Sequence, residues 1–339
     1  MLFLYIVFIF VLIIWGIKFV DNDVFISKER CNSIKGIFIL LIVLTHSMQY
    51  INNSGYEYEG IDMFVPFFKN KMGQMVVVMF LFYSGYGVYL SIKKKGKAYV
   101  NQMPRRRLLT TLLNFDVAVL SFVVLNLFIS KPMSISQVAL SMIGWDSVGN
   151  SNWYIFDILV CYTATYIVAK LSDEKNLWKW LFFLIFICVI VLSFLKKSYW
   201  YNTMMAYPAG VLFAAYQNRI VAVFRKYYLP LLILLGGTFF VTFYQLPKMR
   251  GISDNIASIC FALIVVLLTM KIIVENDFLK WCGEHLFPLY IYQRLSMIVM
   301  YDCFGSEFVK NHAMFFPFIA LLVTCLISRF YNYWQIKMN

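Results

Sequence analysis

Two basic side chains lie in one apolar segment, where ionisable groups are costly and usually face a cavity or a partner. Lys35 stands near the start of a run of apolar residues that leads to His46. Eleven helical steps separate them, which comes within about 20° of three full turns and rises ~16 Å. The two side chains therefore share one helix face, with the cation at a boundary and the imidazole near mid-membrane. A histidine there can accept and return a proton near neutral pH, as a general base does.

Each intramembrane charge also has a structural interpretation. His46 can be a hydrogen-bonded core residue, and Lys35 can be an interfacial anchor whose ammonium group reaches the membrane surface. Asp116 and Arg294 lie inside two other apolar segments, and we expect them to form a buried ion pair rather than to act in catalysis. Asp157 lies near the outer end of its segment, where we expect water to reach it.

A second group of charges is the stretch 93–107, which contains seven basic residues and no acidic one. Such a stretch is usually a topology determinant, and that interpretation needs no ligand. Arg105, Arg106 and Arg107 are consecutive and stand at the start of an apolar segment, so they would also suit a phosphorylated ligand. The residues alone leave both interpretations open.

The composition places these residues in a membrane. Of the 339 residues, 61% are hydrophobic and 14% are charged, whereas a soluble domain has about 45–50% and about 25%. Too few polar residues remain to cover such a core in water. The fold class is therefore all-α, a polytopic membrane helix bundle. The net charge of +13 fits an excess of basic residues on the cytoplasmic side, and we expect no nucleic-acid partner.

The seven cysteines are scattered through the chain and form no CxxC pair and no metal-ligand spacing. The sequence therefore predicts neither a metal site nor a disulfide framework.

A membrane-spanning helix needs about 20 apolar residues, and the pattern of apolar segments predicts about eleven such helices. The seventh is short and is interrupted by Pro208 and Gly210, which is typical of a broken or partial helix. The expected ranges are 2–20, 34–51, 73–92, 108–130, 153–171, 178–195, 204–217, 229–245, 255–275, 286–301 and 313–333.

The basic residues divide unevenly between alternate loops if residues 93–107 face the cytoplasm. That side then holds 20 basic residues and the other side 8, while Lys35 and Arg294 lie within spans, which accounts for all 30. Because basic residues concentrate in cytoplasmic loops, the partition predicts an N-terminus outside and a C-terminus in the cytoplasm. We expect a multi-pass protein of the cytoplasmic (inner) membrane.

Five stretches resemble, in order, spacing and sidedness, the motifs of acyltransferase family 3. These bacterial membrane proteins transfer acyl groups, usually acetyl, to cell-surface carbohydrates. Residues 29–36 and the apolar run to His46 are similar to the family's first motif, in which ten positions lie between a basic residue and the catalytic histidine. The other stretches are the Phe-rich Ser-Gly-Tyr segment at 82–87, the basic segment at 99–109, the Trp-aromatic helix start at 151–154 and the penultimate helix at 289–293.

The resemblance implies that residues 28–339 form the family's ten-helix transmembrane domain and that residues 1–27 add one N-terminal helix and a linker. It implies acyl-CoA, usually acetyl-CoA, as a co-substrate reached from the cytoplasm, with no tightly bound cofactor. The acceptor would be the hydroxyl of a carbohydrate, whether polysaccharide, peptidoglycan or lipid-linked sugar, and membrane lipid would surround the bundle.

The resemblance also implies roles for individual residues. His46 would remove the proton from the acceptor hydroxyl, or else carry the acyl group itself, and Lys35 would lie near the path of the donor. Trp153 and Tyr154 would be platforms for the acceptor sugar, although a plain interfacial aromatic belt explains them equally well. The residues assigned to the donor are Arg105, Arg106, Arg107, Ser84 and Tyr86.

Four features depart from the family's usual pattern. The paired arginines, usually spaced by two residues, are contiguous here, and Thr110 stands where a second arginine would fall. Lys35 stands where arginine is common, which keeps the charge but loses bidentate contacts. Asn32 replaces a frequent aspartate, and Gln293 replaces a frequent histidine. These differences concern the contacts with the donor and leave His46 in place.

Two other classes of protein fit the same composition. A transporter or polymerase of cell-surface glycan precursors, without acyl-transfer activity, would also have many apolar helices and few charges. It would not require the shared face of Lys35 and His46. A non-enzymatic membrane sensor or scaffold would tolerate loss of His46 without loss of activity.

The charge partition leads to a prediction about topology. Because the stretch around Gly96 is expected in the cytoplasm, a cysteine introduced there should be inaccessible to impermeant thiol reagents added to intact cells. A cysteine introduced near Tyr58 should be labelled. Labelling at position 96 from outside would contradict the predicted arrangement, including the side from which the donor enters.

Overall fold

The computed structural model describes residues 1–245 and 250–337, and it is almost entirely helical, as predicted. The strands β1 and β2 pair antiparallel over three residues each, with Ile17 opposite Val274. The elements with regular geometry are α1 Phe3–Gly16, β1 Ile17–Phe19, α2 Lys28–Asn53, α3 Phe64–Met72, α4 Val78–Lys95, α5 Lys97–Met103, α6 Thr110–Phe128, α7 Ile135–Met142, α8 Trp153–Leu171, α9 Leu177–Leu195, α10 Ala206–Ala215, α11 Gln217–Lys226, α12 Tyr228–Phe240, α13 Arg250–Thr269, β2 Ile272–Val274, α14 Asp277–Glu284, α15 Leu286–Ile298, α16 Ser306–Asn311 and α17 Phe316–Trp334.

Short helical turns of other kinds join several of these helices. Two of them, η2 and η3, make the chain between α3 and α6 almost continuously helical. The 3-10 turns are η1 Gly60–Met63, η2 Gly73–Val77, η4 Glu174–Asn176 and η5 Ser198–Trp200, and the π-helical turns are η3 Pro104–Leu109, η6 Val241–Gln245 and η8 Val299–Cys303.

Seven helical stretches within the described residues are long and apolar enough to cross a membrane, so the bundle is polytopic as predicted. An eighth span is possible if α11 and α12, which meet at a bend of 101°, are counted as one. Of the other expected spans, α1 has 14 residues, α10 has 10 and α15 has 13. α1 and α10 are too short to meet the length of about 20 residues, whereas α15 continues directly into η8 as far as Cys303 but is not among the candidate spans, so the count of eleven is not confirmed.

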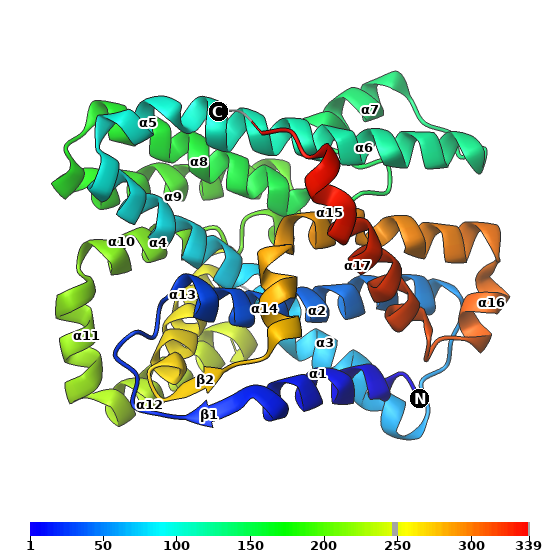
Figure 1. Ribbon diagram of the computed structural model, residues 1–339, viewed down its shortest axis with the longest axis horizontal. Helices are drawn as coiled ribbons and strands as arrows, with labels where there is room; N and C mark the ends of the chain where they lie inside the picture. Colours follow the sequence, from blue (N-terminus) through cyan, green and yellow to red (C-terminus); the bar gives the residue numbers. More distant parts are fainter. Residues whose placement is uncertain (246–249, 338–339) are drawn as a thin grey trace.

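The first helix is docked on the rest of the bundle. In Figure 1, α1 and β1 run along one edge, next to α3 and β2. The ring of Phe318 in α17 lies 5.0 Å from that of Tyr5 and 5.6 Å from that of Phe8. The Asn276 amide donates a hydrogen bond of 3.1 Å to the carbonyl of Leu12. Aromatic contacts and hydrogen bonds therefore join α1 to α17 and to the start of α14.

The backbones of α2 and α14 touch each other through glycine. A Cβ atom on Gly36 would lie 1.9 Å from the Leu279 carbonyl oxygen, and one on Gly283 would lie 1.9 Å from the Asn32 carbonyl oxygen. Close approach at small residues is the usual way in which membrane helices gain van der Waals contact, because lipid provides no hydrophobic force between them. Lys35 is therefore fixed beside this contact.

The pair α4 and α10 uses the same device. A Cβ atom on Gly85 would lie 2.1 Å from the Tyr207 carbonyl oxygen, and one on Gly210 would lie 2.1 Å from the Phe82 carbonyl oxygen. The motif around Ser84 in α4 is therefore held against α10 at backbone distance.

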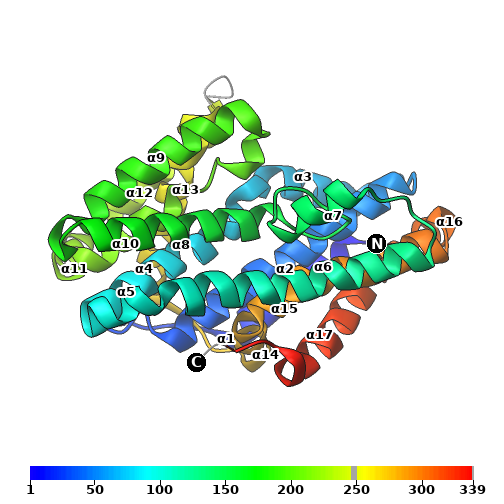
Figure 2. The ribbon, with the colours of Figure 1, turned by 90° about the horizontal axis from the view of Figure 1, so that it is seen from above.

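The remaining helices flank these two contacts. Seen from above in Figure 2, α9, α12 and α13 lie together on one side and α16 and α17 on the other, with α2 between them. The C-terminal segment returns to α6, where Asn114 forms two reciprocal hydrogen bonds of 2.8 Å with the backbone of Ile336.

The glycine contacts lead to a prediction about stability. Gly85→Ala should destabilise the protein by about 1–3 kcal/mol, because the new methyl group overpacks the interface between α4 and α10. Gly87→Ala, in the same helix, is the matched control, since no atom lies within 4 Å of its new Cβ. That variant should be neutral, or stabilised by up to ~1 kcal/mol through helix propensity. Thermal unfolding in detergent compares the two, and equal stability of both variants would contradict the packing.

Candidate functional site

His46 lines a cavity of about 530 Å³, which we call the histidine cavity. Polar and aromatic side chains from seven parts of the chain meet there. They are Thr45, His46 and Gln49 of α2, Lys69 and Asn70 of α3, Gln74 of η2, Ser147, Asn150, Ser151 and Asn152 of one loop, Trp153 of α8 with Tyr199 of η5, and Tyr290 and Arg294 of α15.

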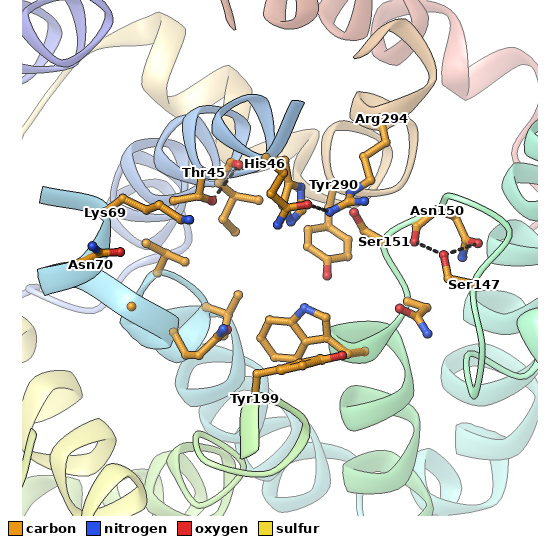
Figure 3. Close-up of a pocket in the computed structure, with 18 residues that line it drawn as sticks. Thr45, His46, Lys69, Asn70, Ser147, Asn150, Ser151, Tyr199, Tyr290 and Arg294 are labelled. Atoms are coloured by element: carbon orange, nitrogen blue, oxygen red, sulfur yellow. Dashed lines mark hydrogen bonds between the residues drawn. The ribbon is translucent and has the colours of Figure 1, made fainter. Parts of the chain in front are cut away.

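The imidazole of His46 faces the cavity with one unpartnered ring nitrogen. Its ring lies 6.4 Å from the ring of Tyr290, and both side chains point into the cavity in Figure 3. The Nδ1 atom of His46 and the hydroxyl of Tyr290 are buried and have no hydrogen-bond partner among the described residues. The structure therefore offers no protein hydrogen bond through Nδ1 that would explain His46 as a purely structural residue.

The histidine cavity carries positive charge. Lys69 and Arg294 both line it, approaching from opposite sides of His46 (Figure 3), and no carboxylate stands among its described lining residues. The Arg294 guanidinium donates to the side-chain oxygen of Gln49. The predicted ion pair between Asp116 and Arg294 is wrong, because α15 turns the arginine toward α2 and the cavity.

The loop between α7 and α8 is preorganised by its own polar side chains. The Ser147 hydroxyl donates a hydrogen bond of 2.7 Å to the Asn150 carbonyl, and the Asn150 side-chain oxygen accepts one of 3.0 Å from the Val148 N–H. Asn152 donates to two further carbonyls of the loop. The Asn150 amide nitrogen and the Ser151 hydroxyl are buried without a partner among the described residues. Two hydrogen-bonding groups therefore remain available in a rigid frame.

The two aromatic residues predicted for the acceptor lie in different places. Trp153 lines the histidine cavity, and its ring lies 6.3 Å from that of Tyr199. Tyr154 is buried behind the cavity wall, with its ring 5.2 Å from that of Tyr290. Trp153 and Tyr199 thus form the aromatic wall. Tyr199 escaped the sequence analysis because it lies in a short turn with no helical pattern.

A second cavity, of about 580 Å³, lies beside the N-terminal part of α2, and we call it the lysine cavity. Lys35, Ser84, Tyr86 and Arg107 all line it, so the structure brings together four of the residues predicted for the donor. Arg107 donates to the Tyr99 hydroxyl at 3.1 Å.

The other two arginines of the basic run lie elsewhere. Arg105 and Arg106 are exposed and line none of the described cavities. The π-helical turn η3, which contains all three arginines, separates their directions. The chain therefore directs one arginine of the run into the bundle and two to the surface.

A third cavity, of about 670 Å³, adjoins the lysine cavity, and we call it the C-terminal cavity. Lys28, Asn32 and Lys35 line both cavities. On its far side lie Asn114 of α6 and Lys337 of the C-terminal segment. The two cavities together form a long polar site with several cations.

A row of aromatic rings stands between the lysine cavity and the histidine cavity. Phe80 lines the lysine cavity, and its ring lies 5.8 Å from that of Tyr154. Tyr154 in turn contacts Tyr290, which faces His46. A ligand held at both ends of α2 would therefore pass an apolar aromatic constriction.

The sequence profile of acyltransferase family 3, described as an acyltransferase domain, matches residues 29–330. The chain belongs to this family. It is therefore a membrane acyltransferase. No curated protein and no solved structure matches the chain significantly. The match begins near the start of α2, so α1 and β1 lie outside it.

One buried carboxylate of this acyltransferase was misjudged from sequence. Asp157 is fully buried in α8, and neither of its side-chain oxygens has a hydrogen-bond partner among the described residues. The expectation that water reaches it is wrong, because α8 packs this face of its first turns against the bundle. Asp157 lies one helical turn after Tyr154, behind the wall of the histidine cavity.

Within the described part of the acyltransferase, no three side chains of His, Cys, Asp or Glu gather in a group that could hold a metal ion. The seven cysteines are all free thiols. The polar side chains that line the histidine cavity are amides, hydroxyls, cations, one imidazole and one indole.

Proposed function

We propose that this acyltransferase moves an acyl group, usually acetyl, from acyl-CoA on the cytoplasmic side to a hydroxyl of a cell-surface carbohydrate. It would act in the cytoplasmic membrane, with its N-terminus outside and its C-terminus in the cytoplasm. The acceptor would be a polysaccharide, peptidoglycan or a lipid-linked sugar.

The observation that carries this proposal is the position of two cavities on one helix. Lys35 and His46 both belong to α2, and they line different cavities, joined by the row of aromatic rings. Their separation along the helix is ~16 Å, a distance that an extended pantetheine arm is suited to bridge. This arrangement supports a donor anchored at Lys35 whose thioester reaches His46.

The proposed reaction needs one proton acceptor at the hydroxyl. His46 removes the proton from the acceptor oxygen, which attacks the carbonyl carbon of the thioester. The resulting tetrahedral oxyanion collapses with cleavage of the carbon–sulfur bond, and the thiolate of CoA leaves. His46 returns its proton to that thiolate, so the histidine ends in its starting form.

The oxyanion needs a hydrogen-bond donor that is already in position. The hydroxyl of Tyr290 fits this role, because it lies beside His46 and has no partner among the described residues. Trp153 and Tyr199 would hold the acceptor sugar on the opposite wall, since aromatic faces stack on sugar rings.

The phosphates of CoA would bind at the other end. Arg107 reaches the lysine cavity, and Lys28 and Lys35 line both that cavity and the C-terminal cavity. Ser84 and Tyr86 would line the path of the pantetheine arm. We propose that Arg105 and Arg106, which are exposed, act through the topology of the chain and not through contact with the donor.

The central prediction concerns His46. His46→Gln should lower acetyl transfer by about 10²-fold or more, because the base is lost while most of the volume is kept. Expression, thermal stability and acetyl-CoA binding should remain near wild type. Purified protein, acetyl-CoA and a glycan acceptor provide the assay, with free thiol as the readout.

His312→Gln is the matched control, because it makes the same change at an exposed histidine that lines none of the described cavities. It should transfer acetyl groups at the wild-type rate. A His46→Gln protein that keeps near wild-type activity would refute general-base catalysis by His46. Such a result would favour the transporter or polymerase interpretation.

A second prediction separates the three arginines. Arg107→Gln should raise the KM for acetyl-CoA about tenfold, as expected for one lost charge-assisted contact worth about 1.5–3 kcal/mol. The double variant Arg105→Gln/Arg106→Gln removes more charge but should leave KM within about twofold, since both side chains lie outside the cavity. Steady-state kinetics on stable, inserted proteins tests both. If only the double variant raised the KM, the donor phosphates would bind to the surface arginines Arg105 and Arg106 and not to Arg107.

A further inference from the structure

We propose that the acceptor carries an anionic group, a carboxylate or a phosphate, beside the hydroxyl that is acylated, and that Lys69 and Arg294 bind this group. The inference rests on the proposed function, since it names the chemical class of the acceptor for the same cavity. It concerns two residues to which the sequence analysis gave no role in binding.

The first observation is that the charge of the histidine cavity is not balanced. Lys69 and Arg294 line it, and among the described residues neither forms an ion pair. Other cations of the protein do find acids, as in the pairs Lys271–Asp21 at 2.9 Å and Lys280–Glu29 at 3.4 Å. The cavity therefore presents two cations whose counter-charge must come from outside the described protein.

The second observation is the unpartnered Nε atom of Arg294. The side chain is partly buried and its guanidinium donates to the neutral amide of Gln49, but its Nε atom is buried without a partner among the described residues. A buried N–H group that lacks an acceptor is costly, and an anion that accepts from it supplies both the missing hydrogen bond and a counter-charge. Arginine is suited to this task because its planar fork matches a carboxylate or a phosphate.

The third observation is the chemistry around the two cations. The loop of Asn150 and Ser151 offers uncharged hydrogen-bonding groups, and Trp153 and Tyr199 offer aromatic faces. These groups suit the hydroxyls and the ring of a sugar. The two cations can bind one acid group, and the neutral groups can bind the rest of the sugar ring. The cavity therefore suits an acidic or phosphorylated glycan better than a neutral one.

The fourth observation is that the positive charge continues along the adjoining surface. Tyr199 lines the histidine cavity and also two neighbouring cavities, of about 520 and 420 Å³. Lys196 and Lys197 line the first of these together with Asp146, and Lys71 lines the second together with Asp254, so the lysines outnumber the acids. A surplus of cations raises the local concentration of an anionic chain and guides its encounter.

The test measures acceptor binding in the absence of donor, so that it does not depend on the chemical step. Purified protein is titrated with trigalacturonate and with its uncharged methyl ester, and in a second arm with a phosphorylated maltotriose and with maltotriose. Tryptophan fluorescence reports binding, since Trp153 lines the cavity. We expect the anionic member of at least one pair to bind at least tenfold more tightly, and the arm that does so identifies the acid group as carboxylate or phosphate.

Two substitutions and one control assign the preference to the cavity. Lys69→Gln and Arg294→Gln should each reduce the preference to less than threefold, whereas Arg294→Lys should keep part of it. Lys310→Gln, which removes an exposed lysine that lines none of the described cavities, should leave it unchanged. If Arg294→Gln does not fold, Lys69→Gln decides alone.

Equal binding of the anionic and neutral glycans in both arms, or a preference that survives in Lys69→Gln, would overturn the proposal. Acetyl transfer, measured separately on the same glycans, distinguishes this failure from failure of the proposed function. Transfer to neutral and anionic acceptors at equal rates would overturn the anionic acceptor and leave acyl transfer intact. If the anionic glycan binds more tightly but no CoA is released, the anion site is supported and acyl transfer to these glycans is overturned.

Discussion

The backbone contact of α2 with α14 determines which side chains line the two cavities on which the proposed chemistry depends. Gly36 and Gly283 let the two helices approach until a Cβ atom would overlap a carbonyl oxygen. Such an approach fixes the rotation of α2 about its axis as well as its position, because only the glycine faces can meet. Since Lys35 and His46 belong to this helix, the same contact sets which cavity each side chain enters. The contact of α4 with α10 does the same for Ser84. Lipid provides no hydrophobic force between helices, so close packing at small residues has to supply this precision.

The two ends of α2 differ in what they can bind. The lysine cavity and the C-terminal cavity share three polar residues and several cations, which fits a long phosphorylated donor. The histidine cavity holds a base, neutral amides, hydroxyls and two aromatic faces. Between them, Phe80, Tyr154 and Tyr290 leave an aromatic constriction. These rings separate the two cavities, so a donor that reached His46 from the lysine cavity would have to pass them.

The sequence predicted the fold class and the main cluster at the donor end, because apolar length and charge position are local properties. Lys35, Ser84, Tyr86 and Arg107 line one cavity, while the roles assigned to them with the donor stay predictions. The sequence did not predict which of three consecutive arginines enters the bundle, since a π-helical turn sets their directions. It also misplaced Asp157 and Arg294, whose surroundings depend on how α8 and α15 pack. The length criterion failed at α1 and α10, which are too short to reach the expected span.

Few basic residues are assigned to the outer side of the membrane, yet half of those few line neighbouring cavities, and the proposed acceptor gives a reason for this. Positive charges are disfavoured on the outer side of a membrane protein, and only 8 of the 30 basic residues are assigned there. Four of these, Lys69, Lys71, Lys196 and Lys197, nevertheless line the histidine cavity or its two neighbours. Lys196 is held in place between the rings of Trp145 and Trp200, at 3.8 and 4.2 Å from their centroids. The preference of basic residues for the cytoplasmic side gives no reason for four lysines of the outer side to lie close together. Their concentration around one mouth is what an enzyme would need if its acceptor is negatively charged.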